Sequence, residues 1–271
     1  MSTNDLSTGQ HHRTLFLSDL HLGADGSRAD LVLEFLRANS AETYFLVGDI
    51  LEPPKPGKAD RGLRAGRVID WLARQAGNGA TIIYVKGNHD LAQTTETAAV
   101  LGEMHSHAIH QLADGRRFLI THGDEEDVGL FQIAWLQRLG SLCDGWTRRA
   151  DLRVALFLRR KFGLGLGRGV MPRVVSGLNA VMYRWGGHER RLVGHARALA
   201  LDGVVCGHFH LPRLHDDHQQ TYANCGDWLD SFTALAEDHR GALSLLQVQT
   251  PPRERAMARR ASGPAIGLGT A

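Results

Sequence analysis

The sequence contains only three cysteines, and none of them belongs to a Cys-x-x-Cys pair. A disulfide framework needs paired cysteines and a zinc knuckle needs closely spaced ones, so this spacing argues against both. We interpret the three as small buried hydrophobic residues. They are Cys143, Cys206 and Cys225.

Long apolar runs are also missing. No segment approaches the roughly 20 apolar residues that a membrane-spanning helix needs, and residues 1–12 lack the apolar core of a signal peptide. The 271 residues are 43% hydrophobic and 22% charged, as in ordinary globular proteins. We therefore expect a cytoplasmic protein with one domain over residues 13–250 and flexible tails at residues 1–12 and 251–271.

Short apolar runs of strand length recur along the chain, and each is followed at once by polar residues of metal-binding type. Helical periodicity separates several of them, and strands that alternate with helices predict an α/β layered domain. Ligands in such domains lie beyond the carboxyl ends of the strands. Later runs without a clear crossover helix predict antiparallel strands of a second sheet. The five polar-ended runs are residues 14–18, 43–47, 81–85, 117–121 and 203–206.

Seven residues after these runs offer carboxylate, imidazole or amide groups. This mixed nitrogen and oxygen donor set suits Mn, Fe or Zn better than Ca, which binds through oxygen. Seven ligands are too many for one open tetrahedral site, but they suit two ions that share a carboxylate, an arrangement used in phosphoryl displacement. The candidate ligands are Asp19, His21, Asp49, Asn88, His122, His208 and His210.

In order and spacing, the blocks that hold these residues resemble the calcineurin-like metallophosphoesterase superfamily. The resemblance implies a two-sheet α/β/β/α sandwich and a metal-dependent hydrolase of phosphoric ester or diphosphate bonds. It also implies a cofactor of two divalent ions, for which we expect Mn²⁺, with Fe or Zn as alternatives. The blocks are Asp19-Leu20-His21, Gly48-Asp49, Gly87-Asn88-His89-Asp90, Thr121-His122-Gly123-Asp124 and Gly207-His208-Phe209-His210.

The resemblance further implies a role for each of these residues. His89 is expected to act on the phosphoryl group or the leaving oxygen, held in place by Asp90. Asn88, His89 and Asp127 are expected to contact the substrate. The expected ligands are Asp19, His21 and His210 for one ion and Asn88, His122 and His208 for the other, with Asp49 bridging.

The remaining ten histidines lack any such context, and we interpret them as surface or packing residues. They are His11, His12, His105, His107, His110, His188, His195, His215, His218 and His239.

A later block, residues 222–228, resembles the branch of the superfamily that contains UDP-2,3-diacylglucosamine hydrolase, an enzyme of lipid A biosynthesis. This implies cleavage of UDP-2,3-diacylglucosamine to UMP and 2,3-diacylglucosamine 1-phosphate. The best-known enzymes of that branch have arginine where this chain has His89. A phosphodiesterase or nucleotide hydrolase of another substrate therefore stays an alternative. An inactive scaffold is a third, which the complete set of ligand positions disfavours.

Residues 127–200 form a long insertion between the fourth and fifth blocks. Thirteen arginines and lysines stand there against four acidic residues, interleaved with aliphatic and aromatic residues. Helical spacing of this kind predicts basic amphipathic helices. They form either a cap that packs on the domain or a surface in peripheral contact with the inner face of a membrane. The segment lacks the aromatic platform of a nucleic-acid-binding surface, so we expect no nucleic-acid partner.

Overall fold

The computed structural model describes residues 9–24, 27–52, 59–90, 95–126 and 187–248. They belong to one compact unit, formed by Met1–Asp127 with Gly186–Val248. Within it, the described strands form a six-stranded sheet and a five-stranded sheet.

The first sheet has the strand order β11-β10-β1-β2-β3-β4. Strands β1 to β4 run parallel, whereas β10 and β11 are antiparallel additions beside β1. Helices α1 (Ala29–Ala38), α2 (Ala59–Gly77) and α3 (Thr95–Leu101) connect the parallel strands. The strands are β1 (Gln10–Leu17), β2 (Asn39–Val47), β3 (Thr81–Val85), β4 (Met104–His105), β10 (Thr233–Glu237) and β11 (Leu243–Gln247).

The second sheet has the order β5-β6-β7-β9-β8. Its three central strands are parallel, and antiparallel strands β5 and β8 form its edges. A short helix, η1 (Asp124–Glu126), follows β6, and α7 (His188–Ala198) precedes β7. The strands are β5 (His107–Gln111), β6 (Arg117–Thr121), β7 (Gly203–Cys206), β8 (Arg213–His215) and β9 (Thr221–Asn224).

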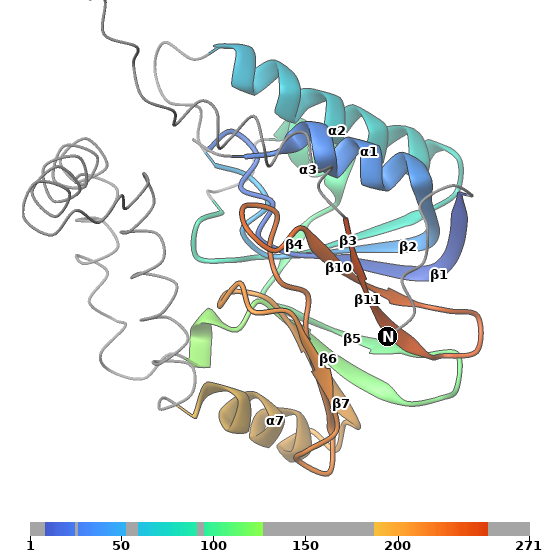
Figure 1. The fold of residues 1–271 in the computed structure, drawn as a ribbon, viewed down its shortest axis with the longest axis vertical. Coiled ribbons are helices and arrows are strands. Elements are labelled where there is room, and N and C mark those ends of the chain that lie inside the picture. The colour runs from blue at the N-terminus through green and yellow to red at the C-terminus, as the bar shows by residue number, and fades with distance from the viewer. Residues whose placement is uncertain (1–8, 25–26, 53–58, 91–94, 127–186, 249–271) are drawn as a thin grey trace, which may run out of the picture. The chain divides into compact units, whose positions relative to one another are not determined.

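Two apolar cores divide the unit into layers. One core joins α1 and α2 to the first sheet, through residues such as Phe35, Trp71 and Tyr44. The other lies between the sheets, where Phe45 of β2 and Phe118 of β6 are buried. Figure 1 shows α1 and α2 beyond the first sheet and α7 beyond the second, so the layers follow the order α/β/β/α. The expected two-sheet sandwich is confirmed. Because most strands are covered on both faces, their sequences do not alternate.

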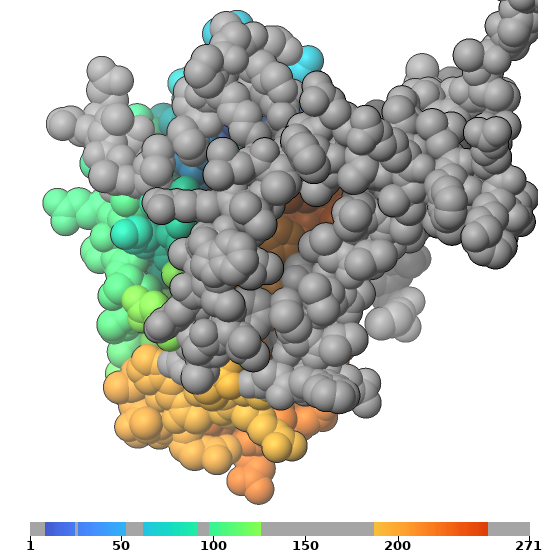
Figure 2. Space-filling model, turned by 90° about the vertical axis from the view of Figure 1, so that its left-hand side faces the viewer, coloured from blue at the N-terminus to red at the C-terminus, as the bar shows by residue number. Residues whose placement is uncertain are grey.

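Two expected boundaries differ from the structure. Strand β1 begins at Gln10, inside the expected tail, because residues 10–12 pair with β2 from Asn39 onward. Helix α7 lies inside the expected insertion, but its buried Leu192 and Val193 make it part of the compact unit, on whose surface it is seen in Figure 2. Residues 127–186 of the expected helical insertion, Asp127 among them, lie outside the described residues. Among the described helices, none is long and apolar enough to cross a membrane.

Candidate metal centre

The polar blocks lie at the carboxyl ends of β1, β2, β3, β6 and β7. Backbone hydrogen bonds join the loops at this edge: the Asp19 N–H donates to the Gly48 carbonyl oxygen, and the Gly207 N–H donates to that of His122, at 3.0 and 3.1 Å. Parallel strands bring their carboxyl ends to one edge, and the packed sheets bring the two edges together. Residues from distant parts of the chain therefore share one site.

Five of the seven candidate ligands have a left-handed backbone. A positive φ costs a non-glycine residue about 1–3 kcal/mol, and such residues concentrate at functional sites. Here the sharp turn lets a side chain leave its strand and point across the sheet edge. The residues and their φ angles are Asp19 (54°), His21 (44°), Asp49 (54°), His208 (71°) and His210 (56°).

Two groups of potential ligand atoms form within this set. The first group is Asp19, His21 and His210, and the second is Asp19, Asp49 and His122; in each, the atoms lie within 4.8 Å of one another. His210 Nε2 is 3.1 Å from Asp19 Oδ1, and His122 Nε2 is 3.3 Å from Asp49 Oδ2. Asp19 is the member that both groups share. The bridging role expected of Asp49 stays a prediction.

The other two candidate ligands adjoin these groups. The His208 ring meets that of His122 edge-on, with centroids 5.1 Å apart, and its backbone N–H donates to Asp19 Oδ2. Asn88 is exposed at the same edge, beside His89, whose backbone N–H donates to Asp49 Oδ1 at 2.7 Å.

Hydrogen bonds on the outer ring nitrogens orient two of the imidazoles. His122 Nδ1 donates to the Val47 carbonyl oxygen at 3.0 Å, and His21 Nδ1 donates to Glu52 Oε1 at 2.8 Å. Each ring therefore turns Nε2 inward, which is how metal-binding histidines are held.

Three inward-facing atoms are buried without a hydrogen bond, although His210 Nε2 and Asp49 Oδ2 lie close to two of them. Among the described residues, Asp19 Oδ1, His21 Nε2 and His122 Nε2 make no hydrogen bond. A buried polar atom left in this state costs about 1–3 kcal/mol, whereas a cation would satisfy all three at once. These residues therefore fit a metal centre.

The electrostatics of the site point the same way. Burial alone would lower the pKa of His122, but its contact with Asp49 and the charges of Asp19 and Asp49 raise it to about 10. For His210, the contact with Asp19 and the charges of nearby carboxylates likewise overcome burial and raise the pKa to about 9. The site thus attracts positive charge, and a divalent ion would take the place of these protons.

A family model described as calcineurin-like phosphoesterase matches residues 12–212, which include every candidate ligand. The chain belongs to this family. The family is described as one of phosphoesterases, and the two ligand groups of this site fit a metal-dependent enzyme of that class. Its family uses two metal ions, which the two ligand groups are able to hold.

A curated relative and several solved structures are similar to the chain. UDP-2,3-diacylglucosamine hydrolase of Blochmanniella pennsylvanica (strain BPEN) is 30% identical over 115 residues, which are 41% of this chain and 46% of the relative. The chain thus matches about half the length of that relative. The phosphoesterase Yfce from E. coli is 16% identical, with 87% of this chain and 99% of that chain covered and a TM-score of 0.41. Vps29 from Entamoeba histolytica, in complex with zinc, is 14% identical, with 87% of this chain and 97% of that chain covered and a TM-score of 0.42.

The family resemblance implied that Asp90 holds His89 in place, but the hydrogen-bond partners of the Asp90 carboxylate among the described residues are other groups. Its carboxylate accepts hydrogen bonds from the backbone N–H groups of residues 49–51 and Gly87 and from the Tyr84 hydroxyl. Asp90 thus holds the Asp49 loop against β3. The described carboxylate that approaches the His89 ring is Glu52, with Oε1 3.8 Å from Nδ1.

Glu52 and Asp227 are two site residues to which the sequence analysis assigned no role. Glu52 joins the Nδ1 atoms of His21 and His89, and Asp227 Oδ1 lies 3.9 Å from His210 Nδ1. Asp227 is fully buried and also accepts hydrogen bonds from the N–H groups of the turn at residues 229–231. Asp227 belongs to the block at residues 222–228 that was noted for its resemblance, and Glu52 follows three residues after the Gly48-Asp49 block, so their places in the sequence were a signal to which no role was attached.

Close packing explains the glycines of two blocks. At Gly48, φ is 79° and a Cβ would lie 2.3 Å from the His122 ring. At Gly87, a Cβ would lie 2.3 Å from Asp49 Oδ1. Both distances are far below van der Waals contact. A side chain at either position would displace a candidate ligand.

Proposed function

We propose that this chain hydrolyses UDP-2,3-diacylglucosamine to UMP and 2,3-diacylglucosamine 1-phosphate. The observation that carries the substrate is the 30% identity to the Blochmanniella hydrolase. The reaction type rests on the metal centre, where buried Asp19 and Asp49 lie among inward-facing imidazoles. Two divalent ions, which we propose to be Mn²⁺, would activate the attacking water and stabilise charge on the phosphoryl oxygens.

The position of His89 beside this centre supports a role for it on the substrate. Its side chain is 44% exposed, and its ring meets that of His21 edge-on with centroids 5.3 Å apart. Glu52 lies 3.8 Å from Nδ1, which leaves Nε2 directed away from the carboxylate. We assign His89 the delivery of a proton to the leaving phosphate oxygen, or a hydrogen bond to the phosphoryl group.

A phosphodiesterase or nucleotide hydrolase without a lipid substrate is the second candidate function. The observation that favours it is His89 itself, because a histidine here is typical of the wider superfamily. The lipid substrate predicts a further property: the basic residues within 127–200 contact the inner face of an anionic membrane.

Two substrates separate these functions. The full-length protein with Mn²⁺ is assayed on UDP-2,3-diacylglucosamine in mixed micelles and on bis-p-nitrophenyl phosphate. We expect release of UMP from the nucleotide lipid. Turnover of the nitrophenyl ester alone would establish the second function, and failure on both substrates with two ions bound would contradict hydrolase activity. Sedimentation with anionic vesicles, and none with neutral vesicles, is the expected membrane result.

A further inference from the structure

A second group of metal-binding side chains lies at the opposite end of β1. His11, Glu42 and His239, here named the His11 cluster, each offer one ligand atom, and these atoms lie within 4.8 Å of one another. His11 lies near the amino end of β1 and Asp19 lies beyond its carboxyl end, eight residues later. At about 3.3 Å per residue, the two sites are about 26 Å apart. The His11 cluster is therefore separate from the metal centre.

Three neighbouring strands supply the cluster. His11 belongs to β1, Glu42 to β2, and His239 follows β10 in its turn to β11. The pairing of His11 with Ser40 fixes the register between the first two strands. The turn is held by Asp238, whose carboxylate accepts hydrogen bonds from the N–H groups of residues 240 and 242. The backbones that carry the three side chains are thus fixed by the sheet.

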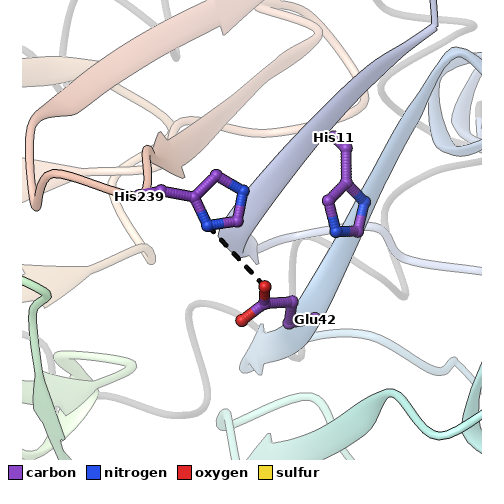
Figure 3. A group of neighbouring side chains, drawn as sticks. All are labelled: His11, Glu42 and His239. Atoms are coloured by element: carbon purple, nitrogen blue, oxygen red, sulfur yellow. Dashed lines mark ion pairs between the residues drawn. The ribbon is translucent and has the colours of Figure 1, made fainter.

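The side chains are turned toward one another, as Figure 3 shows for His239 and Glu42. His239 Nδ1 is 3.6 Å from Glu42 Oε1. Two ligands that share a tetrahedral zinc ion at about 2.0–2.1 Å are about 3.3 Å apart, so this distance is close to that needed. The His11 and His239 rings stack at 5.7 Å with an interplanar angle of 30°.

A hydrogen bond also prepares His11 as a ligand. Its Nδ1 is 2.9 Å from the Ser40 hydroxyl oxygen. When Nδ1 carries the proton and donates it to Ser40, Nε2 has the free electron pair that a metal requires. This is the arrangement seen around metal-bound histidines, where the outer nitrogen has a fixed partner.

From these observations we propose that the His11 cluster is a second metal site, specific for zinc or a similar transition ion. Two imidazoles and one carboxylate form a ligand set typical of zinc, and the exposure of Glu42 and His239 leaves room for water as a fourth ligand. The bound ion joins β1, β2 and the β10–β11 turn. It acts on the stability of this end of the sheet and not on the phosphoryl reaction.

The test counts zinc ions in the full chain without a histidine tag. The protein is loaded with Mn²⁺, equilibrated with micromolar Zn²⁺ and analysed by elemental mass spectrometry, alongside the variants His11→Ala, Glu42→Gln and His239→Ala. The matched control is His107→Ala, since His107 is also exposed and its Nδ1 also lies near a serine hydroxyl, that of Ser106 at 3.0 Å. Exchange of zinc into the metal centre affects all of these proteins alike.

We expect the wild type and His107→Ala to hold one more zinc ion per chain than each cluster variant. Zinc is also expected to raise the melting temperature of the wild type and of the control by about 5 °C beyond any rise in the cluster variants. Equal zinc content in the wild type, His11→Ala and His239→Ala would overturn the proposal. So would an equal thermal shift in all of them.

Discussion

His122 Nδ1 donates a hydrogen bond to the carbonyl oxygen of Val47, 3.0 Å away, although the two residues belong to strand ends of different sheets. Val47 ends β2 of the first sheet, and His122 follows β6 of the second. The bond ties the sheets together at the metal edge and turns His122 Nε2 toward Asp49. The packing of the sandwich and the orientation of a ligand are thus set by one contact.

Asp49 is the carboxylate expected to bridge the two metal ions. Asp49→Ala removes a carboxylate that lies 3.3 Å from His122 Nε2, and with it a negative charge that would hold a metal ion. We expect turnover to fall by more than about 10³-fold, because metal-held charge stabilisation is worth several kcal/mol. Steady-state kinetics and metal content are the measurements. Retained activity would show that the ligand assignment is wrong.

Glu52 is predicted to support metal binding through His21. Glu52→Gln weakens the hydrogen bond that directs His21 Nε2 inward, and partners of this kind contribute about 10–100-fold to metal affinity or activity. Competition with a chelator measures the affinity. The control Glu34→Gln, at an exposed position of α1, is expected to bind metal like the wild type. Equal metal affinity in Glu52→Gln and Glu34→Gln would show that Glu52 does not support metal binding.

His89→Ala is predicted to lower kcat by about 10²–10⁴-fold, the usual contribution of a positioned proton donor. Metal content is expected to stay the same, since His89 is not among the seven candidate ligands. The loss of kcat should be smaller for a substrate with a more acidic leaving group, because such a group departs without being protonated. Loss of metal in this variant would instead make His89 part of the ligand shell.

Gly87→Ala tests the close packing beneath Asp49. Its Cβ would lie 2.3 Å from Asp49 Oδ1 and 2.4 Å from the Asp49 backbone nitrogen, so we expect a loss of stability of about 1–3 kcal/mol and weaker metal binding. Gly66→Ala in α2 is the matched control, since its Cβ meets nothing within 4 Å. That change is expected to stabilise the helix by about 1 kcal/mol. Denaturant unfolding separates the two outcomes.

The stability of the protein in acid is predicted to depend on Glu237. Its buried carboxylate accepts hydrogen bonds from His110 and Thr14 at 2.7 and 2.6 Å, and from the Ala113 N–H at 2.8 Å; it also pairs with Arg13. Burial alone would raise the pKa of Glu237, but these hydrogen bonds lower it from 4.5 to about 2.

Because the folded pKa lies below the ordinary value, the ionised form of Glu237 stabilises the fold above about pH 4.5. That stabilisation, roughly 3 kcal/mol, is lost as the pH falls toward 2. Glu237→Gln should therefore be less stable at neutral pH and should lose less stability on acidification. Urea unfolding at several pH values measures this, with Glu103→Gln, at an exposed position, as the control. Parallel pH profiles for the wild type and Glu237→Gln would contradict the assignment.

The sequence by itself determined the family, the layered α/β class and the set of candidate ligands. It could do so because strand-forming runs and the turns that end them are local features, and each block carries its ligands within a few residues. The histidines of the His11 cluster had no such local context. Nothing near His11 or His239 in the chain marks them as neighbours.

Only the tertiary structure decided which groups meet across long separations. The partners of Asp90, the contact of Glu52 with two imidazoles, and the His122–Val47 bond all join residues on different elements. Likewise, α7 belongs with the second sheet because its buried face packs there, which its basic composition did not reveal. These contacts depend on strand order and sheet packing, which arise from the whole chain folding together and leave no local pattern in the sequence.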